Sequence, residues 1–177
     1  MARFFCLEAS KNVKDYISLK DGTQGMKKAA QMSEFQFFDN KPLTIEIDND
    51  SGRIFQDFIN DNDVPIVSNR LKDFLVSMNV DYLLYKKIIL TQSQLGIEED
   101  YWLALPPRIN CLNREKSIID EILNVADEIV INENKIGRFE IFKLAGVGNL
   151  QIIATEHMAQ ALENRNFVGI HILPINY

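Results

Sequence analysis

Two segments of the sequence run through the same order of residue types, and this order constrains the fold more than any other feature. In the first, the apolar run "VPIV" at 64–67 is followed by Ser68 and then by apolar residues at helical spacing. This pattern predicts a strand that leads directly into an amphipathic helix. Aligning Ser68 with Thr155 superimposes a second such segment on the first. The other matching positions are Leu71 with Met158, Leu75 with Leu162, Asn79 with Asn166 and Val80 with Phe167. True duplication and chance similarity explain this match equally well.

Each of the two segments predicts a strand, a helix of about three turns and a second strand, a short crossover that packs a helix on one face of a sheet. Residues 21–25 and 95–100 are expected to be loops, and 146–149 a hairpin loop. The strand candidates are 3–9, 15–19, 43–48, 64–67, 80–90, 101–105, 127–132, 139–145 and 150–155. The pattern predicts a single α+β domain over 1–177, with two strand-helix-strand units on a mixed, mostly antiparallel sheet. Residues 1–53 give the least regular signal.

Length and composition suit one soluble domain. A chain of 177 residues with 46% hydrophobic and 25% charged residues can bury a core of ordinary size. The N-terminal "MARFFCLEAS" lacks the long apolar core of a signal peptide, and charges interrupt every apolar run before the roughly 20 residues that cross a bilayer. Cys6 and Cys111 lie far apart without a CxxC motif, so neither a disulfide framework nor a zinc site is expected. These features predict a cytoplasmic protein without membrane contact.

Acidic residues concentrate between residues 46 and 63. This segment has six carboxylates against one arginine, in a chain whose formal net charge is -6. Such a surface repels phosphate backbones, which argues against nucleic-acid binding and favours a basic partner. The simpler alternative is a solvated loop region whose charges keep the protein soluble.

The sequence marks no catalytic, metal or cofactor site. Ser68 stands between a strand and a helix, as in a nucleophile elbow, but it lacks the flanking glycines of that motif. It stands where an N-cap hydroxyl accepts a backbone N–H. The two histidines, His157 and His171, have no companion at ligand spacing, and "DNDSG" and "DGTQGMKK" depart from the calcium-loop and phosphate-loop patterns. No carboxylate pair stands out, so a small carboxylate-dependent hydrolase is one alternative, and a ligand-binding or scaffold domain is another.

The order of segments from about residue 54 to 177 resembles immunity protein family eleven of bacterial polymorphic toxin systems. The segments are "IFQDFINDNDVPIVSNRLKDFL", "NVDYLLYKKIIL", "YWLALPPRINCLNREKSII" and "RFEIFKLAGVGNLQIIATEHMAQALENRNFVGIHILPI". The most family-like pieces are Asp57 with Pro65 to Ser68, Leu112 to Ser117, and the closing "GIHILP". The resemblance implies a protein without catalysis that binds and blocks a cognate toxin domain. Residues 1–53 fall outside the resemblance.

An acidic inhibitor suits a basic toxin, such as a nuclease, because opposite charge speeds association and competes for a phosphate-binding surface. Trp102 stands beside an acidic stretch, on the face of its strand opposite Tyr101, and a lone tryptophan there is either core or an interface anchor. Asp57 has a structural alternative, because the family-like motif contains it. The sequence carries no signal for the oligomeric state. The residues expected to contact the toxin are Asp48, Asp50, Asp57, Asp61, Asp63, Glu98, Glu99, Asp100 and Trp102.

Overall fold

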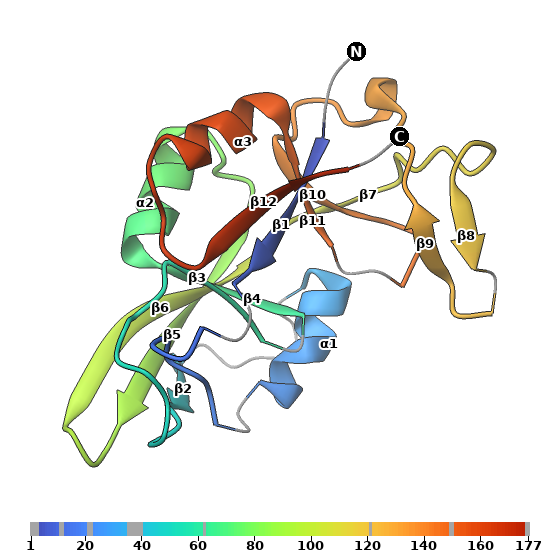
Figure 1. Ribbon diagram of the computed structural model, residues 1–177. Coiled ribbons are helices and arrows are strands. Elements are labelled where there is room, and N and C mark those ends of the chain that lie inside the picture. The colour runs from blue at the N-terminus through green and yellow to red at the C-terminus, as the bar shows by residue number, and fades with distance from the viewer. Residues whose placement is uncertain are drawn as a thin grey trace. The chain divides into compact units, whose positions relative to one another are not determined.

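The computed structural model of the chain describes residues 4–10, 13–20, 23–34, 41–61, 63–120, 122–148 and 151–175 (Figure 1). The chain folds into two compact units, and each is described by itself. Unit 1 comprises residues 1–8, 106–166 and 171–177, and unit 2 comprises residues 9–105 and 167–170. A single domain over the whole chain stays a prediction. Strands predominate over helices in mixed sheets, so the α+β class is confirmed.

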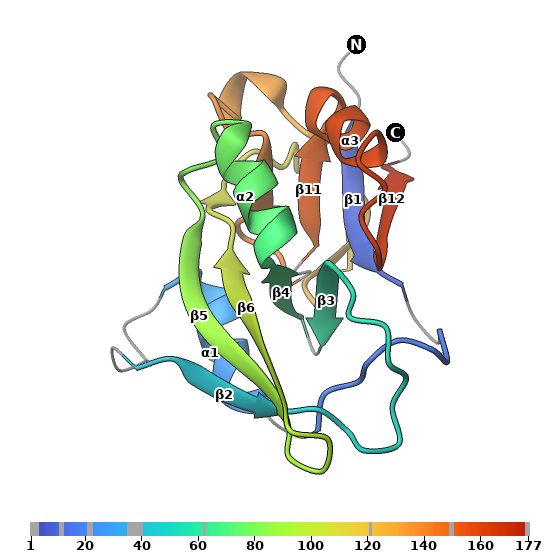
Figure 2. The same cartoon turned by 90° about the vertical axis from the view of Figure 1, so that its left-hand side faces the viewer.

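The described part of unit 2 is built on a five-stranded sheet in the order β2-β5-β6-β4-β3 (Figure 2). β5 and β6 form a long antiparallel hairpin, β4 pairs antiparallel with both β6 and β3, and β2 pairs parallel with β5. The sheet is therefore mixed and mostly antiparallel. Its strands are β2 (Leu43–Glu46), β3 (Phe58–Asp61), β4 (Val64–Ser68), β5 (Leu84–Gln92) and β6 (Ile97–Leu105).

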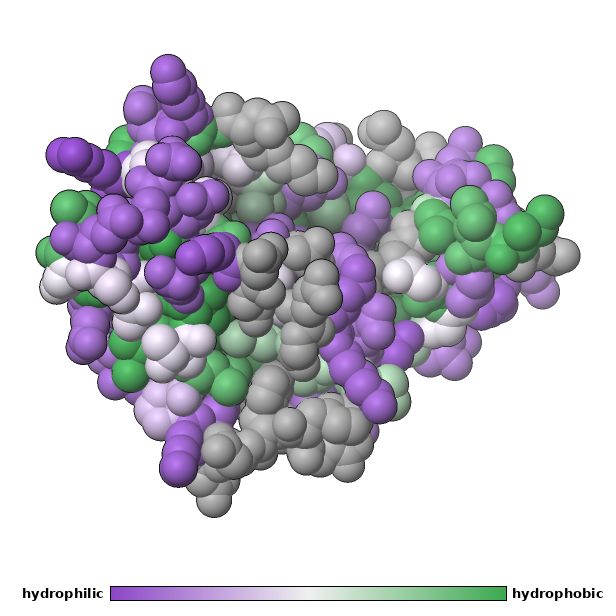
Figure 3. Space-filling view, turned by 90° about the horizontal axis from the view of Figure 1, so that it is seen from below, coloured by the Kyte–Doolittle hydropathy of each residue, from purple (hydrophilic) through white to green (hydrophobic). Residues whose placement is uncertain are grey.

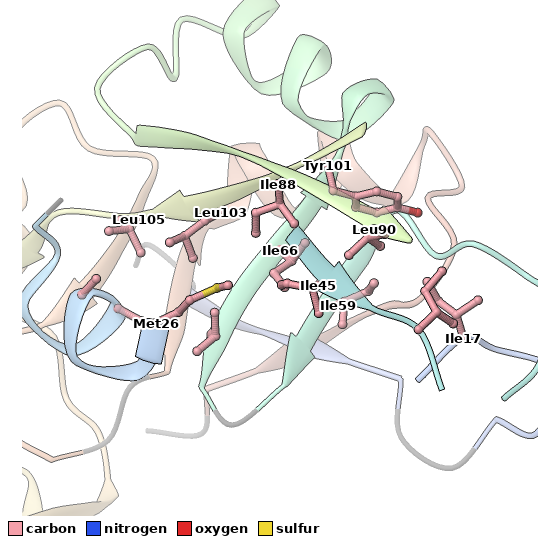
Figure 4. Close-up of a cluster of buried hydrophobic side chains, with 14 residues drawn as sticks. Ile17, Met26, Ile45, Ile59, Ile66, Ile88, Leu90, Tyr101, Leu103 and Leu105 are labelled. Carbon is pink, nitrogen blue, oxygen red and sulfur yellow. The ribbon is translucent and has the colours of Figure 1, made fainter. Parts of the chain in front are cut away.

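One face of this sheet carries the apolar core of unit 2. Side chains alternate along a strand, so Tyr101, Leu103 and Leu105 of β6 share one face and are buried there with residues of β5. Helix α1 (Gln24–Met32) contributes to the same core (Figure 4). Helix α2 (Asn69–Ser77) packs on the strands with Leu71 and Leu75 buried. The other core residues labelled in Figure 4 are Ile17, Met26, Ile45, Ile59, Ile66, Ile88 and Leu90.

Unit 1 has its own five-stranded sheet among the residues described, in the order β12-β1-β11-β10-β7, and a separate two-stranded sheet of β8 and β9. β11 pairs antiparallel with β1 and β10, whereas β10 pairs parallel with β7. The core around Phe4, Phe142 and Ile153 lies against this sheet. The elements are β1 (Phe4–Ala9), β7 (Arg108–Ile109), β8 (Ile118–Asp120), β9 (Val125–Glu128), η1 (Glu133–Lys135), β10 (Ile141–Leu144), β11 (Ile152–Thr155), α3 (Glu156–Glu163) and β12 (Ile170–Pro174).

Several sequence-based predictions were wrong. The strands divide among separate sheets, so the single sheet is not found. Residues 97–100 continue strand β6, although their charges predicted a loop, because pairing with β5 satisfies their backbone groups. The expected loop at 21–25 overlaps the start of α1, and residues 15–19 form isolated bridges but no ladder. β9 begins and ends before the predicted strand 127–132 does. Asp21, Gly22 and Asn149, in the predicted loops, lie outside the described residues.

The ladders beside α2 and α3 have the same register. β4 pairs with β6 so that Ser68 lies opposite Tyr101, and β11 pairs with β1 so that Thr155 lies opposite Phe4. The pairs on the other side of these strands are Phe58 with Val67 and Ile141 with Ala154. The architecture around the two helix starts is therefore repeated, whereas the grouping into two strand-helix-strand units stays a prediction.

Candidate binding surface

Strand β6 carries acidic residues on the face that points away from the core of unit 2. Tyr101 is buried, so alternation directs Glu98, Asp100 and Trp102 to the opposite face. Helix α2 covers this face at Trp102, where the indole Nε1 donates to Asn69 Oδ1 over 2.7 Å. Glu98 and Asp100 lie farther along β6 and are exposed. Glu99 is exposed too, but it belongs to the other face of the strand.

The sheet brings two distant acidic stretches of the sequence together. Thr91 of β5 lies between Glu46 of β2 and Glu98 of β6, which places the Glu46 and Glu98 backbones about 10 Å apart. Beyond Glu46, Ile47 N donates to Thr91 O over 2.8 Å, so the following turn begins beside the same row. Asp48 Oδ1 shapes this turn by accepting from Asp50 N over 3.1 Å. We call this surface the acidic face and define it as Glu46, Asp48, Asp50, Glu98 and Asp100.

Nearby cations offset only part of this negative charge. Lys87 Nζ lies 2.7 Å from Asp100 Oδ2, and Lys20 Nζ lies 3.2 Å from Glu46 Oε2. Both pairs are exposed, where ion pairs contribute little and are screened by salt. Within the described part of the chain, Glu98 and Asp50 have no ion-pair partner. The acidic face therefore keeps a net negative charge.

The half-buried ring of Trp102 is already engaged within unit 2. The ammonium Nζ of Lys72 stands 4.3 Å from the centre of the indole ring and 5.6 Å from that of Tyr85. Burial, with a smaller contribution from Tyr82, raises the pKa of Tyr85. Burial and the charges of Asp57 and Glu99 raise the pKa of Tyr101, so neither tyrosine adds charge at neutral pH.

Asp57 lies away from the acidic face and is only 7% exposed. Its Oδ1 accepts from Ser68 Oγ over 2.7 Å, and its Oδ2 accepts from Arg70 Nη1 over 2.8 Å and from Val168 N over 2.9 Å. Ser68 Oγ in turn accepts from Leu71 N over 3.1 Å and so caps α2. Asp57 thus holds three segments of unit 2 together. This geometry supports the structural alternative for Asp57.

Asp61 and Asp63 lie at a third place in unit 2, beside α1 and apart from the acidic face and from Asp57. Asp61 Oδ2 accepts from the hydroxyl of buried Thr23, and Lys27 Nζ lies 3.6 Å from Asp63 Oδ2. Asp63 has a positive φ of 66°, as expected in the tight connection between β3 and β4. The predicted contact residues are therefore divided between the acidic face, the interior and the edge of α1.

The hydroxyl of Thr155 and the imidazole of His157 lie in structural contacts, and the thiol of Cys111 is buried. Thr155 Oγ1 caps α3 and donates to Glu140, and His157 Nδ1 lies 3.4 Å from the same carboxylate. Burial raises the pKa of Cys111 to about 11, so its thiol stays protonated at neutral pH and is a poor nucleophile. In the ranges that the structure describes, no three His, Cys, Asp or Glu residues are placed to hold a metal ion. No described helix is long and apolar enough to cross a membrane.

A cavity of about 660 Å³ in unit 2 was not predicted from the sequence. Asp50 lines its wall, as do Gln56 and Asn60, whose buried Oε1 and Oδ1 atoms have no hydrogen-bond partner among the residues that the structure describes. Gln56 Nε2 donates to Ile17 O over 3.1 Å. The amide carbonyls make part of the cavity wall polar. No periodic signal in the sequence indicates such a site, because its walls come from strand β3 and from loops that lie apart in the sequence.

Comparison with known proteins identifies the family. A comparison with curated proteins gave no match. The model of the Immunity protein family (Imm11) matches residues 10–176, nearly the whole chain. The match includes most of the N-terminal third, which the sequence resemblance over 54–177 left out, and with it the first acidic stretch of the acidic face. The chain therefore belongs to the Imm11 family of immunity proteins.

Proposed function

We propose that this chain is a non-catalytic immunity protein that binds a cognate toxin domain of a bacterial polymorphic toxin system and neutralises it in the cytoplasm. The observation that carries the proposal is the family match over residues 10–176. The engagement of the candidate nucleophiles in structural roles supports it further. Ser68 and Thr155 cap helices, and Cys111 is buried as a neutral thiol.

The acidic face is the proposed contact surface for the toxin. Its carboxylates stand on a paired β-ladder and on a hydrogen-bonded turn, so they are held in place before the partner arrives. Charges fixed on one side of a protein steer an oppositely charged partner and raise the association rate. The partner would therefore present a basic surface, as a nuclease domain does toward its phosphate substrate. Trp102 borders this face, and the part of its ring that stays exposed beside Lys72 and Asn69 of α2 adds apolar area.

Co-expression with the toxin domain encoded directly upstream tests the proposal. The wild-type chain is expected to restore growth and to co-purify with the toxin at a fixed stoichiometry. The variant Asp50→Lys with Glu98→Lys is expected to lower the association rate by about tenfold or more at low salt. This loss should shrink as salt rises, because the Debye length falls to about 10 Å at 0.1 M.

A matched control reverses two exposed acids outside the acidic face, Asp73 and Asp81, to lysine. This control has the same net charge as the Asp50→Lys, Glu98→Lys variant and should associate faster than it. Equal rates for the two variants would remove the acidic face from the proposal, whereas a wild-type chain that neither rescues growth nor binds would refute the immunity function itself.

A further inference from the structure

The turn between β8 and β9 in unit 1 exposes large apolar side chains. Ile122 is 94% exposed, Leu123 is 69% exposed and Ile118 is 52% exposed. Exposed aliphatic residues are ordinary when scattered, but three in one short hairpin form a patch. Figure 3 shows hydrophobic surface at the right-hand side, where this hairpin lies in Figure 1. We call Ile118, Ile122 and Leu123 the hairpin tip.

Hydrogen bonds hold the hairpin tip in shape. Asp120 Oδ1 accepts from Ile122 N over 2.9 Å and from Leu123 N over 3.0 Å. Asn124 follows with a positive φ of 53°, and its carbonyl oxygen accepts from Gly148 N over 2.6 Å. A Cβ at Gly148 would lie 3.2 Å from that oxygen, so the close approach favours glycine. A turn held in this way loses little conformational entropy when it binds.

The rest of the hairpin is anchored in the core of unit 1. Ala126 of β9 is 4% exposed, and Ile119 of β8, which lies opposite Ala126, packs against the same core. Ile118, which adjoins a register shift in the ladder between Ile118 and Ile119, is exposed on the outer side of the hairpin. Burial of one face explains why the hairpin forms. It does not account for apolar residues on the outer face and in the turn.

The charges near the hairpin tip indicate which class of partner it binds. Residues 118–128 contain no lysine or arginine, and Asp127 and Glu128 of β9 are exposed, whereas the exposed cations Arg114 and Lys116 precede β8. A second copy of the chain docked tip to tip would bring these carboxylates together, and an anionic lipid surface would meet the same repulsion. An apolar pocket with a basic rim complements both the aliphatic side chains and the acids beside them.

We propose that the hairpin tip is an anchor that inserts Ile122 and Leu123 into an apolar pocket with a basic rim on the toxin domain. This inference rests on the proposed immunity function and adds to it a second contact, in unit 1. Buried aliphatic anchors dominate binding energy where they fill a pocket, whereas the charges at the rim mainly set the association rate.

The test measures the affinity of the purified full chain for the toxin domain encoded upstream, made catalytically inactive. Replacing Ile122 and Leu123 together by serine is expected to weaken binding by about 30-fold or more, mainly through faster dissociation. Replacing Asp127 and Glu128 by lysine is expected to slow association, most strongly at low salt. Both variants should keep the melting temperature of the wild type, because the replaced side chains are exposed.

The matched control replaces Met32 and Val76, two other exposed apolar residues, by serine, and it should bind like the wild type. Binding of the Ile122→Ser, Leu123→Ser variant within about twofold of the wild type would overturn the anchor. So would a wild-type dimer that this variant makes monomeric, because the tip would then be a contact between copies. Absence of toxin binding by the wild type would instead refute the immunity function. The experiment therefore distinguishes failure of the anchor proposal from failure of the proposed function.

Discussion

Asp57 is the residue at which sequence context and structural role differ most. In the sequence it is one of several acids in an exposed-looking run, yet its carboxylate accepts bonds from Ser68, Arg70 and Val168. Lys143 shows the same difference, since a charged residue within a strand is expected to face water but is completely buried in β10. Residue type alone does not determine whether a side chain is buried. Burial depends on which strand packs against that residue in the fold.

Replacing Asp57 by asparagine should therefore lower stability and leave toxin affinity unchanged. The substitution removes the charge that strengthens three hydrogen bonds, and we expect a loss of about 2 kcal/mol in the free energy of unfolding. Urea denaturation measures this loss, with Asp73→Asn on the exposed side of α2 as the control. If the Asp57→Asn variant instead bound the toxin more weakly at unchanged stability, Asp57 would have to be reassigned to the contact surface.

At the scale of elements, the sequence predicted best where apolar periodicity and capping agree. Ser68 and Thr155 were recognised as equivalent helix starts, and in both places the cap residue also donates its backbone N–H to the acidic residue that its hydroxyl contacts. Ser68 N lies 2.9 Å from Asp57 O, and Thr155 N lies 3.0 Å from Glu140 O. The sequence could not indicate these acids, because each directly precedes a neighbouring strand, β3 or β10, and meets the cap only after the strands pair.

Alanine at either cap should destabilise the protein by a similar amount. Ser68→Ala and Thr155→Ala are each expected to cost about 1 kcal/mol, because each leaves a backbone N–H of the first helical turn without its acceptor. Thermal and urea unfolding measure the effect, with Ser93→Ala in an exposed turn as the control. Loss of toxin neutralisation by Ser68→Ala without any loss of stability would revive a catalytic role for Ser68.

Secondary-structure elements whose apolar periodicity is short and weak were not predicted from the sequence. Helix α1 has apolar residues at Met26, Ala29 and Ala30, a helical spacing that could have indicated it, but nearby glycines predicted a loop. Four acids of the acidic face are among the predicted contact residues, namely Asp48, Asp50, Glu98 and Asp100. Their contact with a partner stays a prediction. Only the pairing of β2 and β6 with β5 brings Glu98 into one row with Glu46, which was not in the predicted set.

At the scale of the whole molecule, four adjacent strands of one large sheet correspond in position to four of the other, although they follow a different order along the chain. In the sheet of unit 2, β6 lies between β5 and β4 and directly follows β5 in the sequence. In the sheet of unit 1, the strand at the corresponding place, between β12 and β11, is β1, which comes from the other end of the chain. Phe4 O accepts from Ile175 N over 2.9 Å, so the ends of β1 and β12 lie side by side.

A circular permutant should fold for this reason. The variant joins Ile175 to Phe4 through a short glycine-serine linker and opens the chain between Leu95 and Gly96, in the exposed turn of the β5-β6 hairpin. We expect a native circular dichroism spectrum and cooperative urea unfolding. A second permutant, opened between Ile88 and Ile89 inside β5, should not fold. Equal behaviour of the two permutants would contradict the argument.

The division of the chain between the two units has a consequence for recombination between related genes. The chain passes from one unit to the other after residues 8, 105, 166 and 170, so each unit contains residues from distant parts of the gene. A recombination event with one breakpoint in a related gene would therefore mix parental sequences inside a core, where side chains must fit one another. Under the proposed immunity function, new toxin specificity is expected to arise by point substitution on exposed surfaces, and not by exchange of gene segments.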